Sequence, residues 1–127
     1  MKLGYLLFAV TLAACASPTE IGVNASTRIA EDLALSIRHL AEAKTRYGSN
    51  HPEVVRLEAA QASLTQSGHE MSPHFDADLR EAVAYQLALA QQEQAELALR
   101  YAAAHPAMAK NAAVIEALTI GANKRGS

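Results

Sequence analysis

The 127-residue sequence is poor in the residue types that build binding pockets and covalent cross-links. It contains no tryptophan, two phenylalanines, four tyrosines and a single cysteine. One cysteine excludes an intramolecular disulfide, so packing alone must hold the fold together. Because enzyme and cofactor pockets are typically lined by large apolar and aromatic side chains, we expect a protein that is not an enzyme and that binds no cofactor.

The sequence also lacks a strong charge bias and a long apolar run. It has 11 basic and 13 acidic side chains, which are interspersed, and a formal net charge of −2. The absence of a basic stripe argues against a nucleic-acid partner. A membrane-spanning helix needs about 20 consecutive apolar residues. The apolar run at residues 3–14 is too short for that role.

The N-terminal residues have the anatomy of a secretory signal peptide. Lys2 supplies one positive charge, the apolar run follows it, and small residues precede the cysteine. The motif Leu12-Ala13-Ala14-Cys15 resembles the lipobox of bacterial lipoproteins. This resemblance implies that residues 1–14 are a cleaved signal peptide and that Cys15 becomes an acylated N-terminus. An unmodified secretory signal is the alternative interpretation.

The resemblance to lipoproteins also implies a location. Diacylglyceryl and amide-linked chains such as palmitate on Cys15 would anchor the protein firmly, because two or more acyl chains hold a protein stably in a bilayer. The next residue is Ala16, whereas lipoproteins retained in the inner membrane carry aspartate there. We therefore expect an envelope lipoprotein in the outer membrane, with its body facing the periplasm. Residues 15–25 are interpreted as the lipidated N-terminus and a polar tether.

The rest of the chain is dominated by alanine and by helical periodicity. Alanine accounts for 28 residues and has the highest helix propensity. Apolar residues recur three or four positions apart, which predicts four helices at about 26–47, 52–66, 76–105 and 106–121. Pro52 and Pro106 suit first helical positions, and Gly48 and Gly121 suit helix ends. Residues 122–127 are expected to form a disordered tail.

An internal repeat with a period of about 54 residues relates the two halves of this helical region. When residues 25–67 are aligned with residues 79–121 without gaps, thirteen of the 43 pairs are identical. The most specific match is between two turn motifs, Arg46-Tyr47 with His51-Pro52 and Arg100-Tyr101 with His105-Pro106. Because a single hairpin cannot bury its apolar face alone, the repeat predicts two packed αα-hairpins, 26–67 and 76–121. The predicted fold is therefore an all-α antiparallel four-helix bundle.

The histidines of the two turn motifs, His51 and His105, allow two interpretations. In the first, each histidine stands just before the proline that opens a helix, and its ring packs over the tyrosine of its own motif. In the second, the two histidines are symmetric ligands for a bound group. We favour the structural interpretation, because a proline at the start of a helix already explains why the motif recurs.

The segment 69–78 contains the densest set of potential metal ligands in the chain. His69, Met71 and His74 could bind copper or zinc, since imidazole suits both metals and a thioether suits copper(I). The spacing matches no strong zinc motif, and Pro73 argues against the helical His-Glu-x-x-His arrangement. The alternative interpretation is a polar loop between the hairpins, followed by acidic residues that begin the next helix.

Two hypotheses about function follow from these features. The first is a small lipid-anchored helical protein of the envelope that acts as a structural or protein-interaction module. Its partners would be the bilayer, through acylated Cys15, and a second protein or a second copy, through a helix face. The second hypothesis is a periplasmic metal-binding lipoprotein that uses the segment 69–78.

Overall fold

Four α-helices and no strands make up the part of the chain that the structure describes, residues 18–126. In the computed structural model the helices are α2 (Pro18–Tyr47), α3 (Pro52–Met71), α4 (Phe75–Ala98) and α5 (Pro106–Gly126). The prediction of an all-α fold is confirmed. None of these four helices is long and apolar enough to cross a membrane. The predicted signal peptide and Cys15 lie outside the described residues.

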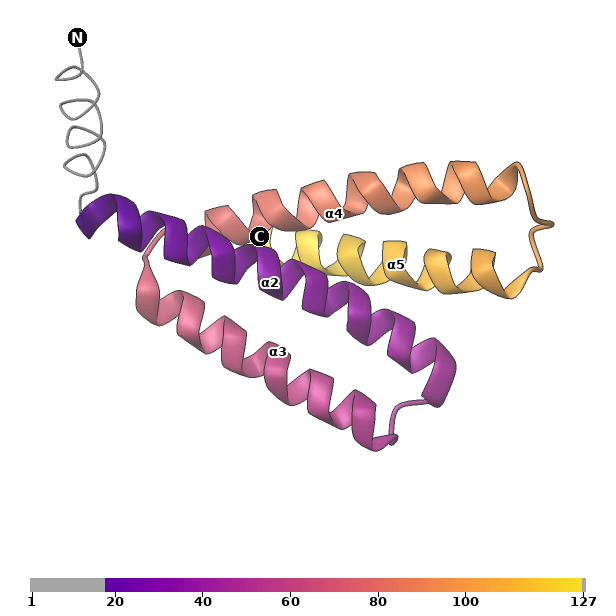
Figure 1. Cartoon of the computed structure of the whole chain (residues 1–127), viewed down its shortest axis with the longest axis horizontal. Helices are drawn as coiled ribbons and strands as arrows, with labels where there is room; N and C mark the ends of the chain where they lie inside the picture. The colour runs from indigo at the N-terminus through magenta and orange to yellow at the C-terminus, as the bar shows by residue number, and fades with distance from the viewer. Residues whose placement is uncertain (1–17, 127) are drawn as a thin grey trace, which may run out of the picture.

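Helix α2 is the central element of the fold. It packs against α3 on one side and against both α4 and α5 on another, whereas α3 meets only α2 and, to a small extent, α4. Figure 1 shows α2–α3 and α4–α5 as two hairpins whose turns lie at the same end of the molecule. The hairpins diverge toward those turns, so that α2 and α5 are farther apart there than near the C-terminus (Figure 1).

A continuous apolar core joins α2 to α4 and α5. Its buried members are Ala30, Leu33, Ala34, Ile37, Ala41, Phe75, Leu79, Val83, Ala90, Val114 and Leu118. Among the described residues, the largest side chains that are fully buried are Phe75, Leu33, Leu79 and Leu118. Each contributes about 1.5–3 kcal/mol by removing apolar surface from water. The alanines add little buried area, so the stability of the fold depends on this short list of large side chains.

Both ends of the helical region extend beyond the predicted bounds. Helix α2 begins at Pro18, which corrects the predicted start near residue 26 and makes residues 18–25 helical. Proline at the first helical position and an acidic residue in the first turn favour a helix start. The glycine at position 22 costs only about 1 kcal/mol in a helix interior. Helix α5 continues to Gly126, which corrects the predicted disordered tail over residues 122–126.

One of the described glycines ends a helix by taking a positive φ. Gly48 does so, with a φ of 87°, and α2 ends beside it. Gly68 and Gly121 lie inside helices, and no other described glycine has a positive φ. Gly68 is instead needed for space, because the ring of Phe75 occupies the position that a Cβ atom would take.

The connection between α3 and α4 is consequently shorter than predicted. Helix α3 runs through Gly68 to Met71, past its predicted end near residue 66, and only residues 72–74 separate it from α4. The backbone N–H of Ser72 closes the end of α3 by donating to the carbonyl of Gly68. His69 and Met71 therefore lie in the last turn of a helix, which corrects the expectation of a loop at these two positions.

Candidate functional site

The first turn motif joins α2 to α3 through a histidine that caps a helix. His51 precedes Pro52, the first residue of α3, and its Nδ1 atom accepts a 3.1 Å hydrogen bond from the backbone N–H of Glu53. The imidazole stacks on the ring of Tyr47 with 4.2 Å between centroids and 15° between planes. The guanidinium carbon of Arg46 lies 5.8 Å from the centre of the same tyrosine ring, within cation–π range. Because a backbone N–H can only donate, Nδ1 must be unprotonated in this arrangement.

The second turn motif has the same geometry between α4 and α5. The Nδ1 atom of His105 accepts a 3.1 Å hydrogen bond from the backbone N–H of Ala107. Its imidazole stacks on Tyr101 with 4.0 Å between centroids and 20° between planes, and Arg100 beside it is exposed. This connection is longer than the first because α4 ends at Ala98, three residues before Tyr101. The end at Ala98 corrects the predicted helix over residues 76–105.

The connection between α3 and α4 contains a histidine–aspartate pair. The Nε2 atom of His69 lies 2.8 Å from Oδ1 of Asp76, and the imidazole stands edge-on to Phe75 with 5.2 Å between centroids. Met71 is exposed at the end of α3, and His74 precedes α4 without a capping hydrogen bond from its side chain. Among the described residues, no group of three or more histidine, cysteine, aspartate and glutamate side chains is placed to hold a metal ion.

Polar side chains tie the two hairpins together between α2 and α4. Ser26 is buried, and its hydroxyl donates a 3.1 Å hydrogen bond to Oδ2 of Asp78. Arg38 donates from Nη2 to Glu93 on α4 at 2.6 Å and from Nε to Glu42 on its own helix at 3.3 Å. Burial opposes the positive charge of Arg38, but the hydrogen bonds to the two carboxylates outweigh burial and raise the pKa of its guanidinium.

Asn111 is a buried polar residue between α4 and α5. Its side-chain amide donates to the backbone carbonyl of Ala90 at 2.9 Å and to Oε1 of Gln94 at 2.8 Å. A shift of α5 along α4 would leave this amide without acceptors, at a cost of about 1–3 kcal/mol. The residue therefore fixes the register of the second hairpin.

A polar hollow lies between α2 and α3 beside the first turn motif. Within it, Arg56 donates from Nη2 and Nε to the two carboxylate oxygens of Glu53, at 2.5 and 3.1 Å. This two-point hydrogen bond lowers the pKa of Glu53 and raises the pKa of Arg56. Both side chains are exposed to solvent to a large degree, so the pair is a local feature of the first turn of α3.

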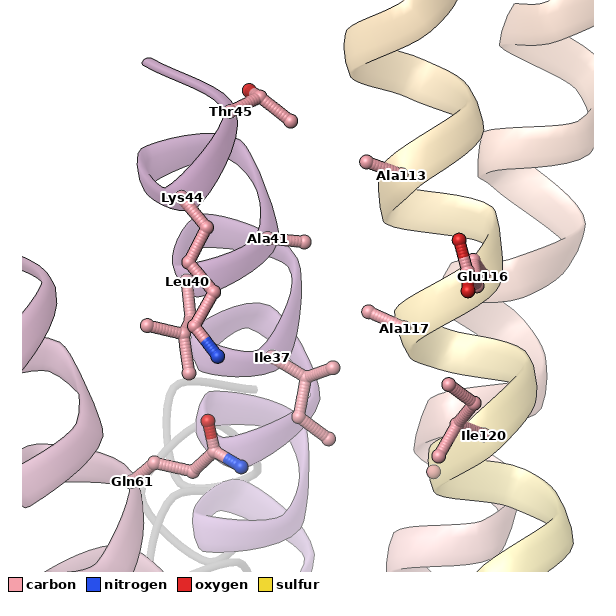
Figure 2. A pocket seen from close by; sticks show the side chains of 11 residues that line it. Ile37, Leu40, Ala41, Lys44, Thr45, Gln61, Ala113, Glu116, Ala117 and Ile120 are labelled. Carbon is pink, nitrogen blue, oxygen red and sulfur yellow. The ribbon is translucent and has the colours of Figure 1, made fainter. Parts of the chain in front are cut away.

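An open apolar groove of about 550 Å³ runs between α2 and α5, with α3 along one border (Figure 2). Its lining residues are Ile37, Leu40, Ala41, Lys44, Thr45, Gln61, Ala113, Glu116, Ala117, Ile120 and Gly121. Ile37 and Ala41 are buried, whereas Ile120 remains 57% exposed. Sequence reasoning missed this groove, because its width depends on the angle at which α5 crosses α2. The available sign was the pair of small residues Ala113 and Ala117, which lie four positions apart on one helix face.

No protein-family model, curated protein or solved structure matches the chain. The two turn motifs contribute helix caps and ring stacking, which are structural features. The groove leaves apolar side chains accessible beside the core.

Proposed function

We propose that the protein is a small lipid-anchored helical module of the bacterial envelope that acts through protein–protein contact. The observation that carries this proposal is the open groove between α2 and α5, which leaves apolar side chains accessible beside the core. Exposed apolar surface of this kind is typical of interaction sites. The lipobox-like motif that ends at Cys15 supplies the anchor in the proposal. The body of the protein would then face the periplasm from the outer membrane.

We further propose that the hairpins 26–67 and 76–121 are two copies of one unit, with a period of about 54 residues, packed as an antiparallel four-helix bundle. The two turn motifs support this proposal through their matched geometry. The histidine and tyrosine centroids are 4.2 Å apart in the first motif and 4.0 Å apart in the second. The capping hydrogen bonds to Nδ1 are both 3.1 Å long. In this proposal the turns reverse the chain, and the helix faces make contact with partners.

Metabolic labelling and cross-linking in bacterial cells test the proposed function. The full chain should incorporate labelled palmitate, fractionate with the outer membrane and be captured by chemical cross-linking in a defined protein complex. Cys15→Ala should lose the label and accumulate as an uncleaved precursor, whereas the matched control Ser17→Ala should be labelled as the original chain is. Labelling that persists in Cys15→Ala, or a full chain that yields no cross-linked complex, would contradict the proposal.

A further inference from the structure

We infer that the groove between α2 and α5 binds the same groove of a second copy of this chain. The inference rests on the proposed function as an interaction module, and it names both the surface and the partner. Three properties of the groove support it, namely its apolar floor, the placement of its charges and its self-complementarity.

The floor and one edge of the groove form an apolar strip that a second protein can cover. Figure 2 shows Ile37 and Ala41 on α2 facing Ala113 and Ala117 on α5. Ile37 and Ala41 are buried, the two alanines of α5 are half-buried, and Ile120 is exposed. The small side chains leave a hollow, and Ile120 is a large apolar side chain at its edge. The same surface therefore contains both a recess, lined by the small side chains, and a projecting side chain, Ile120, that can enter the recess of another molecule.

The two walls of the groove carry opposite charges. Lys44 is on the α2 wall and Glu116 is on the α5 wall, and both are exposed (Figure 2). Neither takes part in an ion pair with another side chain among residues 25–123. Each charge is therefore available to a partner, and the partner must present an anion toward α2 and a cation toward α5.

A second copy of the chain presents this charge order. A two-fold axis along the groove places α2 of each copy over α5 of the other, because such a rotation exchanges the two walls. Lys44 of each copy then faces Glu116 of the other, and Ile120 of each copy faces the α2 wall that contains Ile37. Such an interface is isologous, since the same patch is used on both subunits. Charge complementarity across it selects the partner and its register.

Charge reversal in the full chain tests this pairing. In Lys44→Glu both facing pairs become anionic, and in Glu116→Lys both become cationic, so each variant should dimerise at least about tenfold more weakly than the original chain. When the two variants are mixed, the two substituted side chains face each other with opposite charges, and the other facing pair is the original Lys44 with Glu116. The mixture should therefore form a heterodimer with an affinity near that of the original homodimer. Sedimentation equilibrium of the detergent-solubilised full chain measures these constants.

Two charge reversals outside the groove provide matched controls. Lys110→Glu on α5 and Glu58→Lys on α3 change exposed side chains that do not line the groove, and they should leave dimerisation unchanged. The helical signal in the circular dichroism spectrum verifies that each variant is folded. Heterodimer formation in the mixture also shows that the two groove variants are folded.

Different results would overturn the inference and the proposed function. A monomeric full chain, controls that weaken association as much as the groove variants, or a mixture that fails to pair would each overturn the inference. A monomer that still cross-links to another protein in cells would overturn only the inference and leave the proposed function standing. A dimer formed by a chain that carries no lipid would support the inference and contradict the proposed anchor.

Discussion

Replacement of Gly68 by alanine should destabilise the protein, although alanine is the better helix former. Gly68 lies inside α3 and is buried against the ring of Phe75. A Cβ atom at this position would overlap Cε1 and Cζ of that ring, well inside the 3.0 Å that real Cβ atoms keep from their neighbours. Phe75 is fully buried and belongs to the core shared with α2, so the ring cannot move without disturbing other packing.

Two opposing effects determine how much Gly68→Ala changes the free energy of unfolding. The exchange of glycine for alanine in a helix interior gains about 1 kcal/mol from propensity. Insertion of a methyl group into a well-packed site costs about 1–3 kcal/mol, and overlap with a fully buried ring places Gly68→Ala at the upper end. We expect a net loss of about 2 kcal/mol in the free energy of unfolding, or a Tm lower by about 8 °C. Urea denaturation of the purified chain, followed by circular dichroism, measures this loss.

A neighbouring substitution and a double variant isolate the cause. Ser67→Ala makes the same kind of propensity change at an exposed position of the same turn and should stabilise the protein by a few tenths of a kcal/mol. In a Phe75→Leu background the ring is absent, so Gly68→Ala should cost at least about 1 kcal/mol less than it does in the original chain. Stabilisation by Gly68→Ala alone, or an equal cost in both backgrounds, would refute the role given to the glycine.

Three further predictions concern polar contacts. Asn111→Ala should lower the free energy of unfolding by about 1–3 kcal/mol, because two acceptors lose their buried donor; a loss under about 0.5 kcal/mol in urea denaturation would contradict a register-fixing role. His51→Ala and His105→Ala should each cost about 1 kcal/mol as their helices lose a cap, and strongly unequal urea midpoints would argue against equivalent turns. The Arg56 hydrogen bonds depress the pKa of Glu53 below its ordinary 4.5 in the folded protein. The associated stability is present above that value and is lost as the pH falls through the folded pKa. Arg56→Gln should therefore flatten the acid side of the Tm profile, and an unchanged profile would exclude this coupling.

The starts of α3 and α5 and the end of α2 could be predicted from local sequence, since local rules govern them. Pro52 and Pro106 each stand at the first residue of a helix, because proline has no N–H to lose there and its φ is already helical. Gly48 ends α2 as expected, because nothing but its own backbone is required for a positive φ.

The roles of the other glycines could not be predicted in the same way. Gly68 resembles a helix stop in the sequence, but its role depends on Phe75, which approaches it only after the chain has reversed between α3 and α4. For the same reason the segment that contains His69 and Met71 resembles a loop in the sequence, whereas in the structure both residues belong to α3. Because α3 continues, His69 lies in its last turn, where its Nε2 atom contacts Asp76.

The groove and the contacts between hairpins also depend on the arrangement in space. Arg38 and Glu93 are 55 positions apart in the chain, and no local pattern indicates that they pair. The accessible surface between α2 and α5 depends on how the two hairpins diverge (Figure 1), and this arrangement involves contacts of α2 with helices that are distant in the sequence. The turn motifs were visible in the sequence because their residues are close together in the chain and occur twice.

Intact-mass spectrometry of the chain purified from bacterial envelopes is the most direct test of the proposal that this helical module is held by lipid. The predicted mass is that of a chain beginning at Cys15, without residues 1–14, and carrying the added mass of a diacylglyceryl group and an amide-linked acyl chain. Fragmentation should assign the whole of this added mass to the N-terminal residue. A chain that retains residues 1–14, or one that begins at or after Cys15 with no lipid attached, would contradict the anchoring of this module.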